Sequence, residues 1–383
     1  MIRTYRYPLR PTRQQQEVLT RWLGICCDLY NAALQERRDA WRIARKSISR
    51  FDQNRALTEI RAEDHDVRAV PVKIARSALH RVDRAFQEFF KRSERGRQPG
   101  YPRFRARRHY DSFWFSRFCV RGNRITIRNL GPVKFHWYRT LGGVPQHVTI
   151  GRDSTGKWYA SFRCDVGAAP EKVAVRSAVG IDLGLTTFAT LSDGAEVENP
   201  RWFRTGQRTL KRRQQIRARR QRGSASRERA RVQVAKAYAH VANQRKDFAW
   251  KLSKQLLERY DLIAYEDLAI ARMVHGTFAK SIHDAGWGLF LRCLASKAES
   301  AGKHVIAVDP RGTTQRCSGC GTTVRKDLSQ RTHACTCGVT LGRDHNAAIN
   351  ILALGRSAVE TEKFSVAEAE RAVGAHYPEL DDD

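Results

Sequence analysis

Three short apolar segments in the second half of the chain restrict the folds open to it. They are residues 178–184, 262–265 and 305–308, and stretches long enough for helices separate them. Strands that alternate with helices are typical of an α/β sheet, here one that carries insertions. Residues 188–191 would return from the first strand as the second arm of a hairpin. A helix over residues 344–354 would close the domain.

Acidic residues occupy three special positions in this pattern. Asp182 lies inside the first apolar strand, Glu266 ends the second strand, and Asp344 opens the last helix. A carboxylate inside an apolar strand is costly unless a cation neutralises it. Three acids at one edge of a sheet could hold two divalent cations about 3.5–4 Å apart, which activate a water and stabilise the leaving oxygen of a phosphodiester. Mg²⁺ is the expected ion, because it accepts a few carboxylates and keeps waters or substrate oxygens as its other ligands.

Each acid also has an ordinary structural interpretation. Asp182 could belong to a turn, Glu266 could be a surface charge at a strand end, and Asp344 could cap a helix. Their joint placement in a strongly basic protein favours the metal site. Asp267 is the nearest rival of Glu266, but the next residue along a strand should point the other way.

Four of the nine cysteines crowd into one short segment. The spacing Cys317-x2-Cys320, fourteen residues, then Cys335-x-Cys337 fits a structural Zn²⁺ ribbon. The second pair is one residue closer than usual, which strains its knuckle or lets His333 replace a cysteine. A redox pair and an iron–sulfur cluster are the alternatives. The other five cysteines are expected to be buried, unreactive thiols in a reducing compartment: Cys26, Cys27, Cys119, Cys164 and Cys293.

The charge of the chain points to a polyanionic partner. It has 70 Lys and Arg against 39 Asp and Glu, a formal net charge of +31. So much uncompensated charge repels itself in a compact fold. Two basic helices are predicted over residues 204–222 and 226–259, and the first holds nine Lys and Arg and no acid. A solvated helix face is the alternative, but phosphate binding is favoured, with Lys211, Arg212 and Arg213 as candidate contacts.

The first half of the chain has two periodicities. Residues 1–8 are expected to form a strand, and apolar residues at helical spacing predict helices over most of residues 10–95. From residue 112 to residue 166 the period becomes two, which predicts a small antiparallel barrel or sheet that the first strand joins. The aromatic cluster at residues 113–115 would begin its core.

A basic connector separates these regions. Within residues 97–108, Tyr101, Arg103 and Arg105 interleave an aromatic ring with guanidinium groups, a pattern that suits contact with a nucleic-acid backbone and stacking on bases.

Nothing in the sequence suggests a membrane or a secreted protein. No apolar run approaches 18 residues, and the N-terminus lacks a signal-peptide core. We therefore expect a cytoplasmic protein of a prokaryote, associated with the nucleoid when it binds DNA. Residues 356–383 hold eight acids and three basic residues, and are expected to form a flexible acidic tail.

An ordered series of motifs resembles the TnpB family, the transposon-encoded RNA-guided nucleases related to type V CRISPR effectors. The resemblance covers about residues 1–355. Its main motifs are Gly180-Ile-Asp-Leu-Gly184, Tyr265-Glu-Asp-Leu268, Cys317-Ser-Gly-Cys-Gly321 and Arg343-Asp-His-Asn-Ala-Ala348. Residues 7–12, 29–31, 100–104 and 284–287 also look like that family.

The resemblance implies a multi-domain α/β plus β architecture. A RuvC (RNase H-like) nuclease domain would carry an inserted zinc ribbon, after a helical recognition lobe and a small β-barrel wedge domain. The implied bounds are 1–10 and 110–170 for the wedge barrel, 11–109 for the helical lobe with its connector, 175–312 and 340–355 for the nuclease domain, 313–339 for the ribbon and 356–383 for the tail.

The resemblance also implies the roles of the site residues. Asp182, Glu266 and Asp344 match the catalytic triad, and none is substituted. The helix around Lys73, Arg76 and Ser77 matches only loosely the helix that reads a short motif beside the target. Two departures, the Cys335-x-Cys337 spacing and Gly342 where an acid often precedes Arg-Asp, affect the ribbon more than the cleavage site.

The sequence thus predicts an RNA-guided, Mg²⁺-dependent DNA endonuclease of a transposable element. Its partners would be a guide RNA from the transposon end, one protein per RNA, and double-stranded target DNA. Three alternatives stay open: a nuclease-inactive RNA-guided repressor, a DNA transposase with RNase H-like chemistry, and a structural RNA-binding zinc-ribbon protein.

Overall fold

The computed structural model describes residues 1–96, 98, 100–327 and 329–374, with side chains as far as Thr361. The chain divides into two compact units, Met1–Ala168 and Ala169–Asp383. Each unit has its own core and is described by itself.

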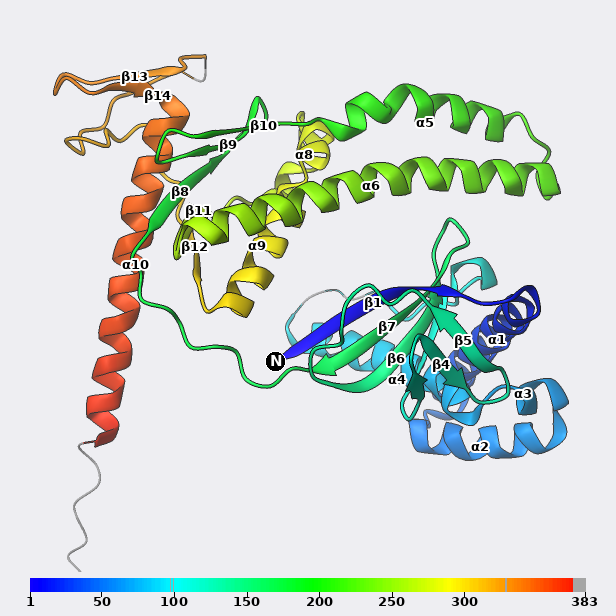
Figure 1. Ribbon diagram of the computed structural model, residues 1–383. Coiled ribbons are helices and arrows are strands. Elements are labelled where there is room, and N and C mark those ends of the chain that lie inside the picture. Colours follow the sequence, from blue (N-terminus) through cyan, green and yellow to red (C-terminus); the bar gives the residue numbers. More distant parts are fainter. Residues whose placement is uncertain (97, 99, 328, 375–383) are drawn as a thin grey trace, which may run out of the picture. The chain divides into compact units, whose positions relative to one another are not determined.

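The first unit is built on a seven-stranded antiparallel sheet with the order β2-β6-β7-β1-β5-β4-β3. Strand β1 lies in the middle of it, pairing with β7 from Ile2 to Pro8 and with β5 at Leu9 and Arg10 (Figure 1). The prediction that the first strand joins the later sheet is therefore confirmed. The strands are β1 (Ile2–Arg10), β2 (Ser112–Phe115), β3 (Cys119–Arg121), β4 (Arg124–Ile127), β5 (Gly131–Phe135), β6 (Val144–Arg152) and β7 (Trp158–Asp165).

Helices fill the sequence between β1 and β2, as the apolar spacing predicts. Thr12 begins the first of them with a capping box, in which its side chain accepts from the backbone N–H of Gln15 and the Gln15 side chain accepts from the N–H of Thr12. Leu19, Trp22 and Cys26 lie on the buried face of that helix. The helices are α1 (Arg13–Ala44), α2 (Arg50–Glu63), α3 (His65–Ala69), α4 (Val72–Glu94) and the 3₁₀ turn η1 (Arg107–His109).

Strand alternation explains the aromatic cluster of β2. Phe113 and Phe115 are buried in the sheet core, whereas Trp114 points the other way and lies edge-on to His80 at 5.3 Å. The cluster thus begins the core, as expected. One expectation is wrong here, because Cys119 on the short strand β3 is exposed. The Cys26, Cys27, Cys164 and Cys293 thiols are buried.

The second unit is built on a five-stranded sheet with the order β10-β9-β8-β11-β12. Strand β11 runs parallel to both β8 and β12, and β9 returns antiparallel to β8. All three apolar segments are strands, so the predicted α/β sheet is confirmed. The strands are β8 (Ala178–Leu183), β9 (Thr187–Leu191), β10 (Glu196–Glu198), β11 (Leu262–Glu266) and β12 (His304–Val308), with a separate hairpin of β13 (Thr332–Ala334) and β14 (Thr340–Gly342).

Helices cover both faces of this sheet. Val179 and Ile181 pack on one face with residues of α6 and α9. On the other face α10 crosses directly over β8, because Gly180 has no side chain: a Cβ there would lie 2.0 Å from the backbone oxygen of Ala348. The helices are α5 (Trp202–Ala218), α6 (Ala225–Arg259), α7 (Ile270–Met273), α8 (Ala279–Ala285), α9 (Trp287–Ala301) and α10 (Arg343–Gly374) (Figure 1).

The last helix is longer than the sequence predicts. We expected α10 to end near Leu354 and a flexible tail to begin at Arg356, but the backbone is helical as far as Gly374. Ala and Glu, both good helix formers, are frequent in this stretch, so local propensity continues the helix beyond the sheet. Residues 375–383 lie outside the described part. Within that part, no helix has the length and apolar character needed to cross a membrane.

Candidate active site and cysteine cluster

The fold places three acids at one edge of the second sheet. Asp182 and Glu266 lie at the carboxyl ends of β8 and β11, and the parallel register that pairs Ile181 with Tyr265 brings them side by side. Asp182 shares a face of β8 with Gly180, two residues earlier, and this face is covered by α10. Asp344 lies in the first turn of α10. The predicted convergence of the three acids therefore follows from strand register and one helix crossing.

Electrostatics show that the acids act on one another. Burial, followed by the carboxylates of Glu266 and Asp344, raises the pKa of Asp182 from 3.8 to about 7, against a smaller lowering effect of Arg343. Burial also raises the pKa of Glu266. A bound cation would favour the ionised form of such a cluster at neutral pH. Oxygen donors at a sheet edge fit a hard divalent ion such as Mg²⁺.

Glu266, and not its neighbour, faces the site. The side chain of Glu266 is 8% exposed and that of Asp267 is exposed to solvent. This difference agrees with the strand alternation used to choose between them.

Two contacts that the sequence did not predict hold the acids in place. The buried hydroxyl of Thr313 donates to Oε1 of Glu266 at 2.5 Å, and Nε of Arg343 donates to Oδ1 of Asp344 at 3.1 Å. Asn350 of α10 fixes the Thr313 backbone by donating to its carbonyl oxygen at 2.8 Å. Thr313 lies in an irregular loop after β12, where no periodic signal marks a residue.

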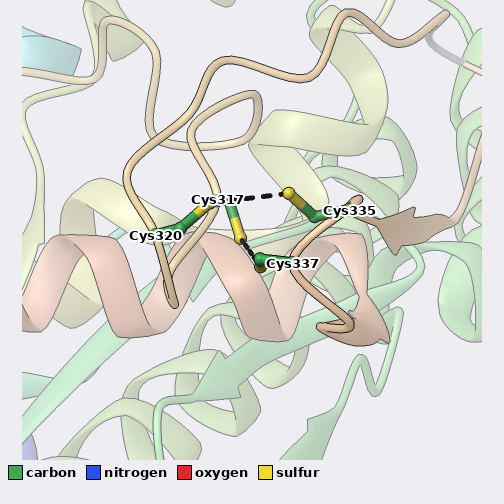
Figure 2. Close-up of side chains that lie close together, drawn as sticks. All are labelled: Cys317, Cys320, Cys335 and Cys337. Atoms are coloured by element: carbon green, nitrogen blue, oxygen red, sulfur yellow. Dashed lines mark hydrogen bonds between the residues drawn. The ribbon is translucent and has the colours of Figure 1, made fainter.

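The four predicted cysteines form one cluster (Figure 2). Their Sγ atoms all lie within 4.8 Å of one another, and the Cys317–Cys337 and Cys320–Cys335 pairs are each 3.6 Å apart. A tetrahedral Zn²⁺ with Zn–S distances of about 2.3 Å separates its sulfurs by about 3.8 Å. Hydrogen bonds from Thr322 and the neighbouring cysteines lower the pKa of Cys320 to about 6. The pKa of Cys337 is raised, because a backbone bond from Val339 lowers it by less than the other three thiols together raise it. The short Cys335-x-Cys337 spacing is therefore compatible with a four-sulfur site.

His333 is not part of this cluster. It is fully buried, and its Nδ1 contacts the Lys326 ammonium. Among the described residues, the group whose ligand atoms all lie within 4.8 Å of one another consists of the four cysteines and does not include His333. The idea that His333 replaces a cysteine is thus wrong.

Asparagines of α10 join the cysteine cluster to the acidic site. Asn346 follows Asp344 by two residues on α10. Its side chain accepts from the N–H of Ser318 at 3.0 Å and donates to the carbonyl of Arg316 at 2.8 Å. Asn350, one turn further along the same face, donates to that carbonyl at 2.7 Å. The loop that carries Cys317 is therefore fixed to the helix that carries an acid.

The predicted nucleic-acid contacts differ in their exposure. Lys73 and Arg76 project from α4, and Lys211 and Arg212 project from α5. Arg213 is half-buried and donates to the backbone of Gln233 on α6, so it also holds the α5–α6 hairpin together. Ser77 is buried and bonds to Ile74 of its own helix, which turns it away from solvent.

The connector is fixed to α1 by its backbone. The Tyr30 hydroxyl donates to the carbonyl of Arg103 at 3.3 Å. Asn31 donates to the carbonyl of Arg105 and accepts from its N–H, both at 2.9 Å. The side chains of Tyr101, Arg103 and Arg105 are exposed. The motif at residues 29–31 thus has a structural role that its sequence did not reveal.

Asp284 is a further residue whose role the sequence left open. It is 4% exposed and accepts from the N–H groups of Phe203 and Arg204, at 2.6 and 3.1 Å, in the first turn of α5. It also forms a 3.0 Å ion pair with Arg245 of α6. One carboxylate therefore joins α5, α6 and α8.

Comparisons with known proteins agree with the motif series. A family model described as "Probable transposase" matches residues 161–276, one described as "Cas12f1-like, TNB domain" matches residues 287–351, and one described as "Helix-turn-helix domain" matches residues 1–46. In the structure residues 1–46 hold β1 and the single long helix α1.

Two bacterial proteins match almost the whole chain. A putative RNA-guided DNA endonuclease of Streptomyces pristinaespiralis is 33% identical over 93% of this chain and 90% of its own length. The putative RNA-guided DNA endonuclease InsQ of Escherichia coli K12 is 29% identical, and the match covers 93% of each protein. The cryo-EM structure of a Cas12f1–sgRNA–target DNA complex shares the fold, with a TM-score of 0.56 and 15% identity over 89% of this chain and 83% of that one. The chain therefore belongs to the TnpB family of transposon-associated RNA-guided DNA nucleases.

Proposed function

We propose that this protein is an RNA-guided DNA endonuclease that hydrolyses both strands of double-stranded DNA next to a short flanking motif. The observation that carries the proposal is the convergence of Asp182, Glu266 and Asp344 at the edge of a parallel sheet in a chain of net charge +31. Base pairing with a guide RNA from the transposon end would supply the sequence specificity, with one protein per RNA. Both similar bacterial proteins carry names with this activity.

The domain assignments form part of the proposal. The second unit would be a RuvC nuclease domain interrupted by a zinc ribbon, and the seven-stranded sheet would be a wedge domain of barrel type. The position of the cysteine cluster between β12 and α10 supports the inserted ribbon.

The three acids would hold two Mg²⁺ ions, which supply a nucleophilic hydroxide and stabilise the leaving oxygen. Asp182 interacts with both other acids, because the charges of Glu266 and Asp344 each raise its pKa. The Thr313 hydroxyl orients Glu266, and the Arg343 guanidinium fixes one oxygen of Asp344. The four cysteines would hold a structural Zn²⁺ whose removal frees the loop attached to α10.

The test is cleavage of a plasmid library with randomised flanking motifs by the purified protein–RNA complex, with sequencing of the bound RNA. We expect Mg²⁺-dependent cutting that Glu266→Ala abolishes and Asp267→Ala, at the exposed neighbouring position, leaves intact. Motif-dependent binding without any cutting would indicate the repressor. Strand joining without an RNA requirement would indicate a transposase.

A further inference from the structure

A hollow in the first unit combines exposed aromatic rings with arginines. It has a volume of about 660 Å³ and lies between the end of α1 and the connector. Its lining residues are Leu34, Arg38, Trp41, Arg42, Arg45, Tyr101, Pro102, Arg103 and Phe104. Trp41, Tyr101 and Phe104 are 55%, 45% and 48% exposed, although large aromatic side chains are usually buried.

One of these rings, that of Tyr101, is held in place by packing, and the Trp41 ring has a guanidinium group beside it. The ring of Tyr101 packs edge-on against Phe86 and Phe89 of α4, with ring centroids 5.6 and 5.5 Å apart. Arg45 caps the C-terminal end of helix α1. Its N–H donates to the carbonyl of Trp41 at 3.1 Å, and its guanidinium lies 5.8 Å from the Trp41 ring. A ligand that enters the hollow therefore meets a packed ring at Tyr101 and a ring with a cation beside it at Trp41.

The charge of the hollow selects an anionic ligand. Four arginines line it, and among the lining residues that the structure describes there is no carboxylate. Arg42 forms an ion pair with Asp39 at 3.3 Å, but the Arg42 side chain is 70% exposed. An exposed pair is weak, so Arg42 can still bind an anion. A second hollow, of about 620 Å³, on residues of α4 and the same connector contains Glu88 and lacks this uniform charge.

We propose that this hollow binds an unpaired segment of RNA, with bases stacked on Trp41, Tyr101 or Phe104 and phosphates bound by the arginines. Aromatic rings that alternate with cations recognise single strands, because every base has a stacking face and every nucleotide a phosphate. RNA is favoured over DNA because the loops and ends of RNA present unstacked bases at all times, whereas target DNA presents a single strand only after its duplex has opened. The inference rests on the proposed function and names the part of the chain that would hold the single-stranded RNA.

The test uses the full-length chain with Asp182→Ala, so that cleavage cannot intervene. The probes are a fluorescein-labelled 12-nucleotide single-stranded RNA, its DNA counterpart and an RNA hairpin of equal length. Trp41→Ala should weaken binding of the single-stranded RNA roughly tenfold, and Trp41→Phe should retain most of it. Arg38→Gln should reduce the slope of log affinity against log salt by about 0.7.

The matched control is Phe51→Ala. Phe51 is a 73% exposed aromatic residue of the same unit with Arg50 over its ring, but it lies outside the hollow. Equal losses for Trp41→Ala and Phe51→Ala, or a loss confined to DNA or to the hairpin, would overturn the inference. Photo-crosslinking of a 5-bromouridine probe should map to the hollow, and crosslinks found only elsewhere would also overturn it. A chain that binds no RNA at all would instead refute the proposed function.

Discussion

The hydroxyl of Thr313 donates a 2.5 Å hydrogen bond to the carboxylate of Glu266, in a place where both side chains are buried. The same hydroxyl lies 3.0 Å from the carbonyl of Pro310, but it carries one proton, and an ionised carboxylate is the stronger acceptor. This bond lowers the pKa of Glu266 against the effect of burial, which is the larger of the two. Thr313 therefore helps an acid of the candidate active site to keep its charge and its orientation.

Thr313→Val should reduce the rate of DNA cleavage by about tenfold, because a hydrogen bond to a charged group contributes about 1.5–3 kcal/mol. Thr313→Ser should restore most of the rate, since it keeps the hydroxyl. The measurements are single-turnover cleavage over a Mg²⁺ series and, separately, the rise in melting temperature that Mg²⁺ produces. If the valine variant matches the parent in both, the hydrogen bond has no role in the site.

The raised pKa of Asp182 makes the stability of the magnesium-free protein depend on pH. Burial and two neighbouring acids raise this pKa from 3.8 to about 7, so between these values the folded chain binds a proton that the unfolded chain has released. The contribution of Asp182 to stability is thus present at low pH and is lost as the pH rises toward 7.

Asp182→Asn removes the charge, so we expect it to stabilise the magnesium-free protein at pH 8, with a gain that shrinks as the pH falls toward 5. Urea unfolding at the two pH values, in buffer without magnesium, measures the gain. Asp267→Asn at the exposed neighbouring position of the site serves as control and should change neither value. A gain that is the same at both pH values would contradict the assigned pKa.

Much of this site could be predicted from the sequence, because strand geometry determines it. When an apolar strand contains an acid or ends in one, the position of that acid along the strand shows that it lies at the edge of the sheet. Side chains alternate between the two faces of a strand, so Glu266 is buried at the site and Asp267 is exposed. The cysteine spacing likewise identified all four sulfurs of the cluster.

Contacts between distant, irregular segments could not be predicted. Thr313 reaches Glu266 from a loop, and Arg213 bonds to the backbone of a different helix. Such bonds depend on tertiary placement, and neither composition nor period encodes it.

Loss of the cysteine cluster should affect cleavage although no cysteine contacts the acids. Cys320→Ser should lower the zinc content measured by mass spectrometry, lower the melting temperature and reduce cleavage by roughly tenfold or more. The reason is that Asn346 and Asn350 attach the loop of the cluster to α10, which carries Asp344. Cys119→Ser, an exposed cysteine of the other unit, is the matched control and should change none of the three quantities. Zinc loss with full cleavage would show that the two sites are independent.

Asp284 should contribute more to stability than an acid of the second unit whose ion pair is exposed. Its removal leaves Arg245, 23% exposed, without its partner and leaves two N–H groups of α5 without their acceptor. Breaking a buried pair in this way costs about 3–5 kcal/mol. Asp284→Ala should therefore lower the free energy of unfolding by about 3 kcal/mol, as measured by urea denaturation.

Asp247 of α6 provides the comparison, because its pair with Lys251 has side chains that are 62% and 72% exposed. Asp247→Ala should cost about 0.5 kcal/mol or less. Asp284→Asn loses the charge and keeps only one acceptor oxygen, because its NH₂ group replaces one of the two oxygens that accept from α5, so its cost should lie between the two. If Asp284→Asn is as harmful as Asp284→Ala, the charge and the second acceptor account for the cost; if it is harmless, one acceptor oxygen is enough. Equal small costs for Asp284→Ala and Asp247→Ala would mean that the basic α5–α6 hairpin does not depend on this carboxylate.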